Sequence, residues 1–173
     1  MFKRFYPDAY GHSTYALKYE EYYKKGIRGL IFDIDNTLVP HDAPADRQAL
    51  KLFKRLERIG FQSCFLSNNG EARVQSFNEK IGIHYIYKAN KPKKGAYLRA
   101  MELMGTDATN TLAVGDQLFT DVWGANRVGI HCVLVKPIHP KEKWSIVLKR
   151  YLEKPILYFY HRQRQKTIPV KRK

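Results

Sequence analysis

The feature that most constrains the fold is an alternation of short apolar runs with segments of helical periodicity. Between the runs lie segments of about ten residues whose apolar side chains recur at helical spacing. In the segment that ends at Gly60, the apolar positions share one face: Leu50, Phe53, Leu56 and Ile59. Five runs read as buried strands: GIRGLIFDI, FQSCFLS, IHYIYKA, TLAVGD and IHCVLV. This alternation predicts a three-layer α/β protein, with a central parallel five-stranded sheet and helices on both faces.

Polar side chains follow four of the five predicted strands. Because the carboxyl ends of parallel strands meet at one edge of a sheet, where ligands bind, these side chains are expected to lie together. They are Asp33 and Asp35 after the first strand, Ser67, Asn68 and Asn69 after the second, Lys91 after the third, and Asp116, which follows Gly115, at the end of the fourth.

Four short motifs carry a resemblance to a known family. The segment LIFDIDNTLV resembles the first motif of the haloacid dehalogenase (HAD) superfamily of phosphohydrolases. SNN at 67–69, KP at 91–92 and GDQLFTD at 115–121 follow in the expected order, so the resemblance covers roughly residues 27–136. It implies a Rossmann-like HAD fold and hydrolysis of phosphate monoesters.

The chemistry of phosphate esters explains the residue types in these motifs. The ester is negatively charged, so an enzyme must neutralise that charge and hold the attacking oxygen in line. The resemblance implies that Asp33 attacks phosphorus and forms an aspartyl-phosphate. It implies that Asp35 protonates the leaving alkoxide and later takes a proton from water.

Clustered carboxylates repel one another, and a divalent cation relieves that repulsion. Mg²⁺ prefers oxygen ligands and bridges carboxylates to phosphate. The resemblance implies Mg²⁺ as cofactor, with Lys91 beside the nucleophile, although Lys93 and Lys94 are rivals for that role. The other implied positions are Asp33, the carbonyl of Asp35 and Asp116 as metal ligands, Asp121 behind them, and Ser67, Asn68 and Thr37 at the phosphate.

Each motif alone has a plainer interpretation. Acidic residues after strands often cap helices, and serine or asparagine there is an ordinary turn residue. Three further polar residues near the first motif match no family position and read as a solvated loop: His41, Asp42 and Asp46. The plainer interpretations fail jointly, because four strand ends would have to carry such residues by chance.

The spacing of the motifs predicts an open site. Only 31 residues separate Asp35 from Ser67, and 23 separate Ser67 from Lys91, which leaves no room for a folded cap domain. The chain then reads as one capless domain over residues 1–173. An open site suits a phosphate attached to something large, or a site that an oligomer partner covers.

The charge of the chain lies mostly at its C-terminal end. The net charge is +15, and residues 136–173 hold twelve Lys and Arg against two Glu. Residues 137–173 read as an amphipathic helix, interrupted by Pro155, and a basic tail. Aromatic residues beside these cations favour contact with an anionic membrane surface, whereas the helix alone could equally pack on the sheet edge. Nucleic acid could also use the cations, but no nucleic-acid-binding fold accompanies them.

The capless spacing, Tyr-rich N-terminal segment and basic tail together resemble the YqeG-like branch of HAD subfamily IIIA. That branch is similar to phosphatidylglycerophosphate phosphatases, so the resemblance implies a lipid phosphate as substrate. A soluble or protein phosphate remains the alternative, as does a nucleic-acid-binding protein with weak catalysis. Transferase chemistry is a weaker one, because an open site admits water.

Two sequence features bear on the compartment. Cys64 and Cys132 lie in apolar runs and read as reduced core thiols. The N-terminus MFKRFYPDAY lacks the apolar stretch of a signal peptide, and no run reaches the ~18 apolar residues of a spanning helix. We therefore expect a cytoplasmic protein, in peripheral contact with a membrane.

Overall fold

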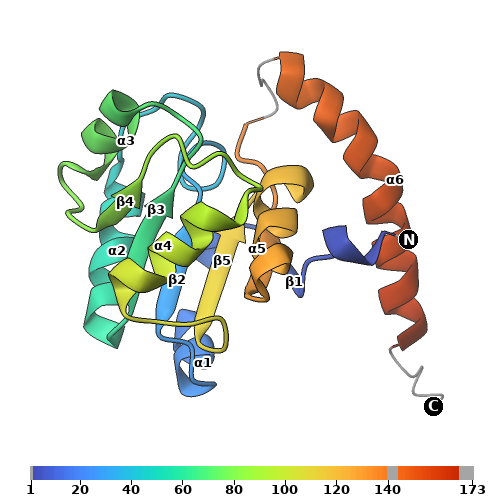
Figure 1. Cartoon of the computed structure of the whole chain (residues 1–173), viewed down its shortest axis with the longest axis horizontal. Helices are drawn as coiled ribbons and strands as arrows, with labels where there is room; N and C mark the ends of the chain where they lie inside the picture. Colours follow the sequence, from blue (N-terminus) through green and yellow to red (C-terminus); the bar gives the residue numbers. More distant parts are fainter. Residues whose placement is uncertain (1, 140–143, 168–173) are drawn as a thin grey trace.

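The structure is a computed structural model that describes residues 2–139 and 144–167. A six-stranded, entirely parallel sheet forms its centre, in the order β1-β6-β5-β2-β3-β4 (Figure 1). The strands are β1 (Ala9–Gly11), β2 (Gly29–Phe32), β3 (Gln62–Leu66), β4 (His84–Ile86), β5 (Thr111–Gly115) and β6 (His131–Val135). The predicted parallel α/β class is confirmed, with one strand more than expected.

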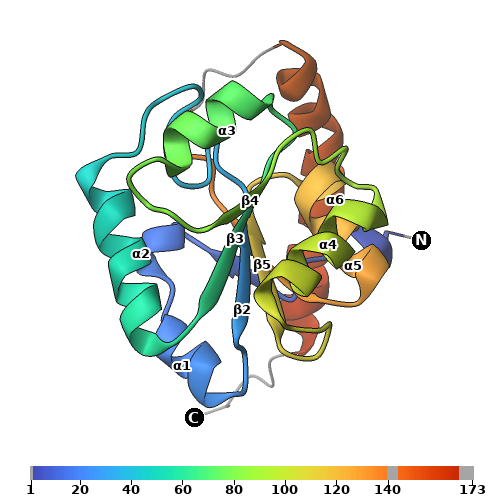
Figure 2. The same cartoon turned by 60° about the vertical axis from the view of Figure 1, so that its left-hand side comes forward.

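Helices cover both faces of the sheet, as Figure 2 shows with the sheet seen nearly edge-on. One face carries α1 (Tyr19–Lys24), α2 (Arg47–Ile59) and α3 (Glu71–Asn78). The other carries α4 (Lys94–Met104), the π-helical turn η3 (Leu118–Val122), α5 (Trp123–Val128) and α6 (Trp144–Thr167). The two 3₁₀ turns of the N-terminal segment are η1 (Lys3–Phe5) and η2 (Thr14–Ala16).

Each face of the sheet has its own apolar core. Side chains alternate between the faces along each strand, so Phe32 joins the core under α2 while its neighbour Ile31 joins the core under α4. Four phenylalanines pack edge to face in a row through the first core, with centroids 5.0–5.3 Å apart: Phe32, Phe53, Phe65 and Phe77. Cys64 and Cys132 are buried, unpaired thiols in the second core.

The sixth strand, β1, extends the sheet beyond β6. Its three residues pair with Val133, Leu134 and Val135. The segment AYG is too short to show the alternation that identifies a strand, so only its pairing with β6 makes it one. The Tyr-rich N-terminal segment forms two short helical elements, η2 and α1, and Ser13 caps η2 by accepting the Tyr15 N–H at 3.2 Å.

The helix α2 begins and ends at capping residues. Asp46 accepts the N–H of Ala49 at 2.8 Å and is the N-cap, so the helix begins at Arg47. Gly60 ends it in the left-handed conformation with φ 106°, as predicted.

The C-terminal helix α6 differs from the expected one in two ways. It continues through Pro155, because that residue lies on the exposed side, where water can bond the carbonyl that proline leaves without a partner. Its buried residues are Glu153, Ile156 and Tyr160, whereas Tyr151 and Leu152 of the predicted apolar face are exposed. The last residues of the basic tail, 168–173, lie outside the described residues.

The connections between strands leave the carboxyl edge of the sheet accessible. Residues 36–61 form one loop and α2, and residues 68–83 form a turn and α3. None of the described helices combines the length and the apolar character needed to cross a membrane.

The contact between α4 and α5 gives a test of packing. Gly124 faces the ring of buried Tyr97, and a Cβ there would lie well inside van der Waals contact with that ring. We expect Gly124→Ala to lower the free energy of unfolding by about 1–3 kcal/mol in urea titrations. Gly95→Ala, where a Cβ meets open space, is the matched control and is expected to be neutral or slightly stabilising. Equal stability of the two variants would contradict this packing.

Candidate active site

The centre of the site is a buried lysine between two carboxylates. The Lys91 side chain is 4% exposed, and its Nζ lies 2.7 Å from Asp33 Oδ1 and 2.7 Å from Asp121 Oδ1. Lys93 and Lys94 are exposed, so the geometry selects Lys91 from the three. Three segments far apart in the sequence therefore meet at one ammonium group.

The fold positions each carboxylate from a strand end. Asp33 follows β2, and its N–H continues the ladder to Val114 at 3.0 Å. Asp121 lies in η3, and its Oδ2 accepts the N–H of Gln117 at 3.1 Å. Gly115 at the end of β5 leaves no room for a Cβ, because the Asp121 carboxylate occupies that space. The glycine of GDQLFTD is therefore needed for the close approach of Asp121 to the strand.

A third carboxylate completes the cluster. Asp116 is 2% exposed and accepts a hydrogen bond from Thr37 Oγ1 at 3.0 Å. Oxygen atoms of Asp33, Asp116 and Asp121 all lie within 4.8 Å of one another. Thr37 thus orients Asp116, which differs from the phosphate contact expected for it.

The charges of this cluster favour a bound cation. The cluster holds three buried carboxylates and one lysine, so its own formal charge is negative. All candidate ligand atoms are carboxylate oxygens, the donors that hard divalent cations such as Mg²⁺ prefer. The residues present therefore fit the divalent metal expected of this site.

The pKa values reflect the same balance. Burial raises the pKa of Asp33 to about 6. The positive charge of Lys91 lowers this pKa, and the negative charge of Asp121 raises it. Burial alone would lower the pKa of Lys91, but the charges of Asp121 and Asp33 outweigh it and raise that pKa. Lys91 therefore remains charged at neutral pH.

The second aspartate of the first motif, Asp35, points toward a different set of donors. Its Oδ1 accepts the backbone N–H of Asp42 at 2.8 Å and Nη2 of Arg73 at 2.9 Å. Its Oδ2 accepts a hydrogen bond from the side-chain amide of Asn69. His41 Nδ1 lies 3.9 Å from Oδ1. Asp35 thus lines the same pocket as Asp33 but bonds to groups other than Lys91 and Asp121.

The residues after β3 divide into two roles. Ser67 is 1% exposed, and its Oγ accepts the N–H of Asn69 at 3.2 Å. Asn68 bonds the backbone of Lys91 twice, accepting its N–H at 2.7 Å and donating to its carbonyl at 3.3 Å. Asn68 therefore fixes the loop that carries Lys91 and also lines the pocket.

Sequence reasoning missed several residues of the site. Asp42 and Asp46 are exposed, as the solvated-loop interpretation predicted, and Asp46 caps α2. The loop also contributes to the site, because His41 borders the pocket and the Asp42 N–H bonds Asp35. The position of Arg73 one turn into the helix after SNN was the available signal. The pocket, of about 190 Å³, is lined by Asp33, Asp35, Asn36, His41, Ser67, Asn68, Asn69, Lys91, Gln117 and Thr120.

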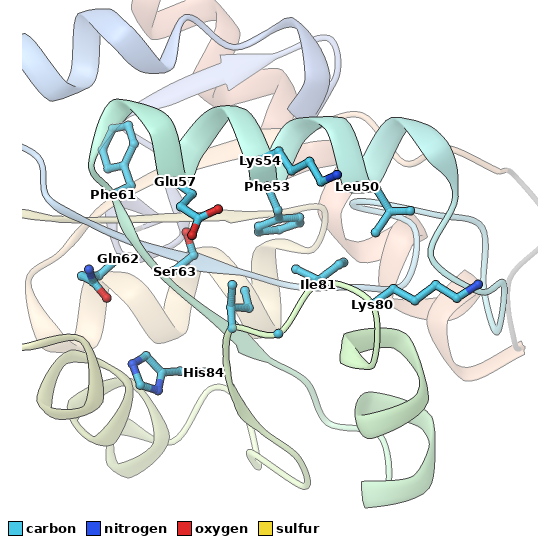
Figure 3. Close-up of a pocket in the computed structure, with 12 residues that line it drawn as sticks. Leu50, Phe53, Lys54, Glu57, Phe61, Gln62, Ser63, Lys80, Ile81 and His84 are labelled. Carbon is cyan, nitrogen blue, oxygen red and sulfur yellow. The ribbon is translucent and has the colours of Figure 1, made fainter.

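A second pocket, of about 410 Å³, lies between α2 and the loop before β4 (Figure 3). It opens beside Gln62 and Ser63, at the amino end of β3, away from the edge where parallel sheets bind ligands. Its charged residues are Lys54, Glu57 and Lys80, and no carboxylate cluster lies among its lining residues. The candidate catalytic groups are therefore those at the carboxyl edge.

The fold and this edge define a class of protein. A parallel sheet with paired aspartates after one strand, a serine after the next, a buried lysine, and aspartates after a further strand is the arrangement of HAD hydrolases. A family model described as HAD-hydrolase-like matches residues 88–137, which include the lysine and the last motif.

Comparisons with individual proteins identify the family. Over 159 residues the chain is 36% identical to the probable phosphatase YqeG of Bacillus subtilis, covering 91% of this chain and 92% of that protein. It is 28% identical over 153 residues to phosphatidylglycerophosphate phosphatase 1 of Arabidopsis thaliana, covering 76% of this chain and 43% of the relative. Among solved structures, a putative subfamily IIIA HAD hydrolase from Legionella pneumophila superposes with a TM-score of 0.53 at 24% identity, over 66% of this chain and 69% of that one.

The chain belongs to the HAD superfamily, and within it to the YqeG family of phosphatases. The resemblance inferred from the four motifs is thereby confirmed.

The burial of Asp33 predicts that the stability of the protein depends on pH. With its pKa raised to about 6, Asp33 keeps its proton in the folded state to higher pH than in the unfolded chain. Below about pH 4 Asp33 is protonated in both states, and the stability that its protonated form provides is fully present. That stability is lost as the pH rises through 6, where the buried carboxyl group ionises. In chelator, we expect Asp33→Asn to gain about 2 kcal/mol over the wild type between pH 4 and pH 7.

The measurement is thermal unfolding of both proteins across that pH range. Glu79→Gln, at the exposed position directly after α3, is the control and is expected to follow the wild type. A stability gap between Asp33→Asn and the wild type that narrows toward pH 7 would show that burial does not dominate the Asp33 site.

Proposed function

We propose that the protein is a Mg²⁺-dependent phosphomonoesterase that works through an aspartyl-phosphate on Asp33, with a lipid phosphate of the phosphatidylglycerophosphate type as substrate. The observation that carries the reaction is the Lys91 ammonium bridging Asp33 and Asp121, with Asp116 in the same cluster. The phosphatase class of the family supports hydrolysis of a phosphate monoester.

In the first step, a carboxylate oxygen of Asp33 forms a bond to phosphorus while the bond from phosphorus to the leaving oxygen breaks. Asp35, which lines the pocket, gives a proton to that oxygen and releases an alcohol. Lys91 holds Asp33 in place and offsets the negative charge of the phosphoryl group. The position of Asp35 beside Arg73 and Asn69 supports its role on the leaving-group side.

In the second step, water attacks the aspartyl-phosphate and Asp35 takes its proton. The bond from phosphorus to Asp33 breaks, which returns the carboxylate and releases inorganic phosphate. Ser67, at the end of β3, would contact the phosphoryl oxygens from the opposite side of the pocket.

The metal would be held by Asp33, Asp116 and the backbone carbonyl of Asp35, with Asp121 bracing the cluster and Thr37 orienting Asp116. Once bound, Mg²⁺ would supply positive charge that offsets the negative charge of the carboxylates and of the phosphate. Asp121 remains engaged by Lys91 and the Gln117 N–H, and this keeps it behind the metal ligands.

Two observations support a large substrate. The segments between the motifs form single helices and loops, so we infer a capless domain whose pocket opens to its surroundings. A pocket of about 190 Å³ is smaller than the ~300–1,000 Å³ of sites that enclose a small molecule. It suits a phosphate group that projects from a larger body, such as a membrane lipid at the inner surface of the cell.

The substrate proposal is tested by phosphate release from phosphatidylglycerophosphate in mixed micelles, beside a panel of sugar phosphates, nucleotides and a phosphopeptide. We expect Mg²⁺-dependent release from the lipid, abolished in Asp33→Asn, because that amide cannot act as nucleophile. Glu79→Gln is again the matched control. A soluble phosphate with a kcat/KM orders of magnitude above that of the lipid would overturn the substrate, and an active Asp33→Asn would overturn the nucleophile.

The contact between Arg73 and Asp35 predicts dependence on the leaving group. Arg73→Ala removes a donor that orients the general acid, so kcat should fall by about 10-fold or more on alkyl phosphates, which need a proton on the leaving oxygen. On p-nitrophenyl phosphate, whose leaving group needs no proton, the fall should be much smaller. Arg99→Ala, an exposed site on α4, is the control. Equal losses on both substrates would indicate a purely structural role for Arg73.

A further inference from the structure

The helix α6 presents two different faces. Glu153, Ile156 and Tyr160 recur at helical spacing and are buried against the body of the protein. On the opposite side, the described side chains are all exposed: Tyr151, Pro155, Tyr158 and Arg162. In Figure 1, α6 runs down one side of the molecule and begins above the arrowheads of the strands.

The exposed side of α6 is rich in large apolar side chains. Tyr151 is 63% exposed, Tyr158 60% and Leu152 57%. The N-terminal segment adds to them, because Phe2 stacks on Phe159 with ring centroids 6.1 Å apart. Such a group, drawn from both ends of the chain, exceeds the single exposed hydrophobic residues that are normal on protein surfaces.

Cations surround these rings. We define the aromatic–basic face as Phe2, Lys3, Arg4, Tyr151, Leu152, Lys154, Tyr158, Phe159 and Arg162, all of them exposed. Lys154 Nζ lies 4.5 Å from the centroid of the Tyr151 ring. The acidic residue of α6, Glu153, points inward and accepts the N–H of Leu118 at 2.8 Å. The face therefore combines apolar area with positive charge.

These properties fit an anionic lipid surface. Tyrosine and phenylalanine rings settle at the boundary between head groups and acyl chains, while Lys and Arg are attracted to anionic head groups. A second copy of this chain would bring like charges together at the same face. In a groove that binds nucleic acid, bases stack on successive aromatic side chains. This face offers less area for such stacking, because Leu152 and cations lie among its rings.

The aromatic–basic face lies close to η3, the turn that carries Asp121. The bond from Leu118 to Glu153 joins α6 to the start of η3, directly after Gln117, which lines the pocket. Only the thickness of one helix, about 10 Å, therefore separates the exposed side of α6 from the loop that carries Asp121.

We propose that the aromatic–basic face is the surface by which the protein binds an anionic bilayer, which places lipid head groups beside the pocket. The identity of the lipid at the pocket rests on the proposed function, whereas binding to the bilayer does not. The N-terminal turn η1 is thus part of the membrane-binding surface, together with α6.

The test is flotation of the full-length protein with vesicles that contain no phosphomonoester lipid. One set contains phosphatidylglycerol in phosphatidylcholine, and the other is phosphatidylcholine alone. The variant combines four changes on the face: Tyr151→Ser, Lys154→Glu, Tyr158→Ser and Arg162→Glu. The matched control places similar changes elsewhere, namely Lys51→Glu and Lys54→Glu on α2 with Tyr87→Ser. All proteins retain the tail at 168–173.

We expect the wild type and the control to float with phosphatidylglycerol vesicles and not with phosphatidylcholine. The variant should bind at least ~10-fold more weakly, because two cations and two interfacial rings are lost. Turnover of p-nitrophenyl phosphate and far-UV circular dichroism should be the same in all three proteins, which shows that the fold and the site are intact.

Equal flotation of variant and control would overturn the proposal, as would a wild type that does not float. A wild type that stays unbound to vesicles but binds an RNA oligonucleotide, with that binding lost in the variant, would assign the face to nucleic acid instead. A protein that floats but hydrolyses no phosphate monoester would overturn the proposed function and leave the membrane-binding surface standing.

Discussion

The burial of Lys91 between Asp33 and Asp121 is the interaction on which the site depends. Removing three charged groups from water is costly, and their mutual attraction offsets that cost only where the hydrogen-bond geometry is good. The protein meets this condition with neighbours that fix each partner: Asn68 holds the backbone of Lys91, and the Gln117 N–H holds Asp121. A charged cluster this well fixed is prepared for a phosphoryl group before any substrate arrives.

The parallel sheet explains why these groups can meet. Each crossover returns the chain to the amino end of the next strand, so every carboxyl end points to the same edge. The order β6-β5-β2-β3-β4 places β2, which carries the paired aspartates, between the strands that lead to Asp116 and to Ser67. Gly115 then lets Asp121 lie against the end of β5, where a larger residue would displace it.

The two aspartates of the first motif serve different surroundings, although one residue separates them. Asp33 faces the lysine and the other carboxylates, where burial raises its pKa. Asp35 faces Arg73, Asn69 and the Asp42 N–H. In the proposed mechanism, this separation would give Asp33 access to phosphorus and Asp35 access to the leaving group. The aromatic–basic face lies beside η3, which carries Asp121.

The sequence by itself determined the class of fold, the family and the residues of the cluster, because strand–helix alternation and motif order are local patterns that periodicity and spacing reveal. Contacts between distant segments of the chain could not be predicted from the sequence. The strand β1 exists only through its pairing with β6, Arg73 and Asn68 acquire their roles only from the loops they meet, and the exposed side of α6 is defined by how Glu153 and Tyr160 pack. These depend on which distant segments lie side by side, and tertiary packing alone decides that.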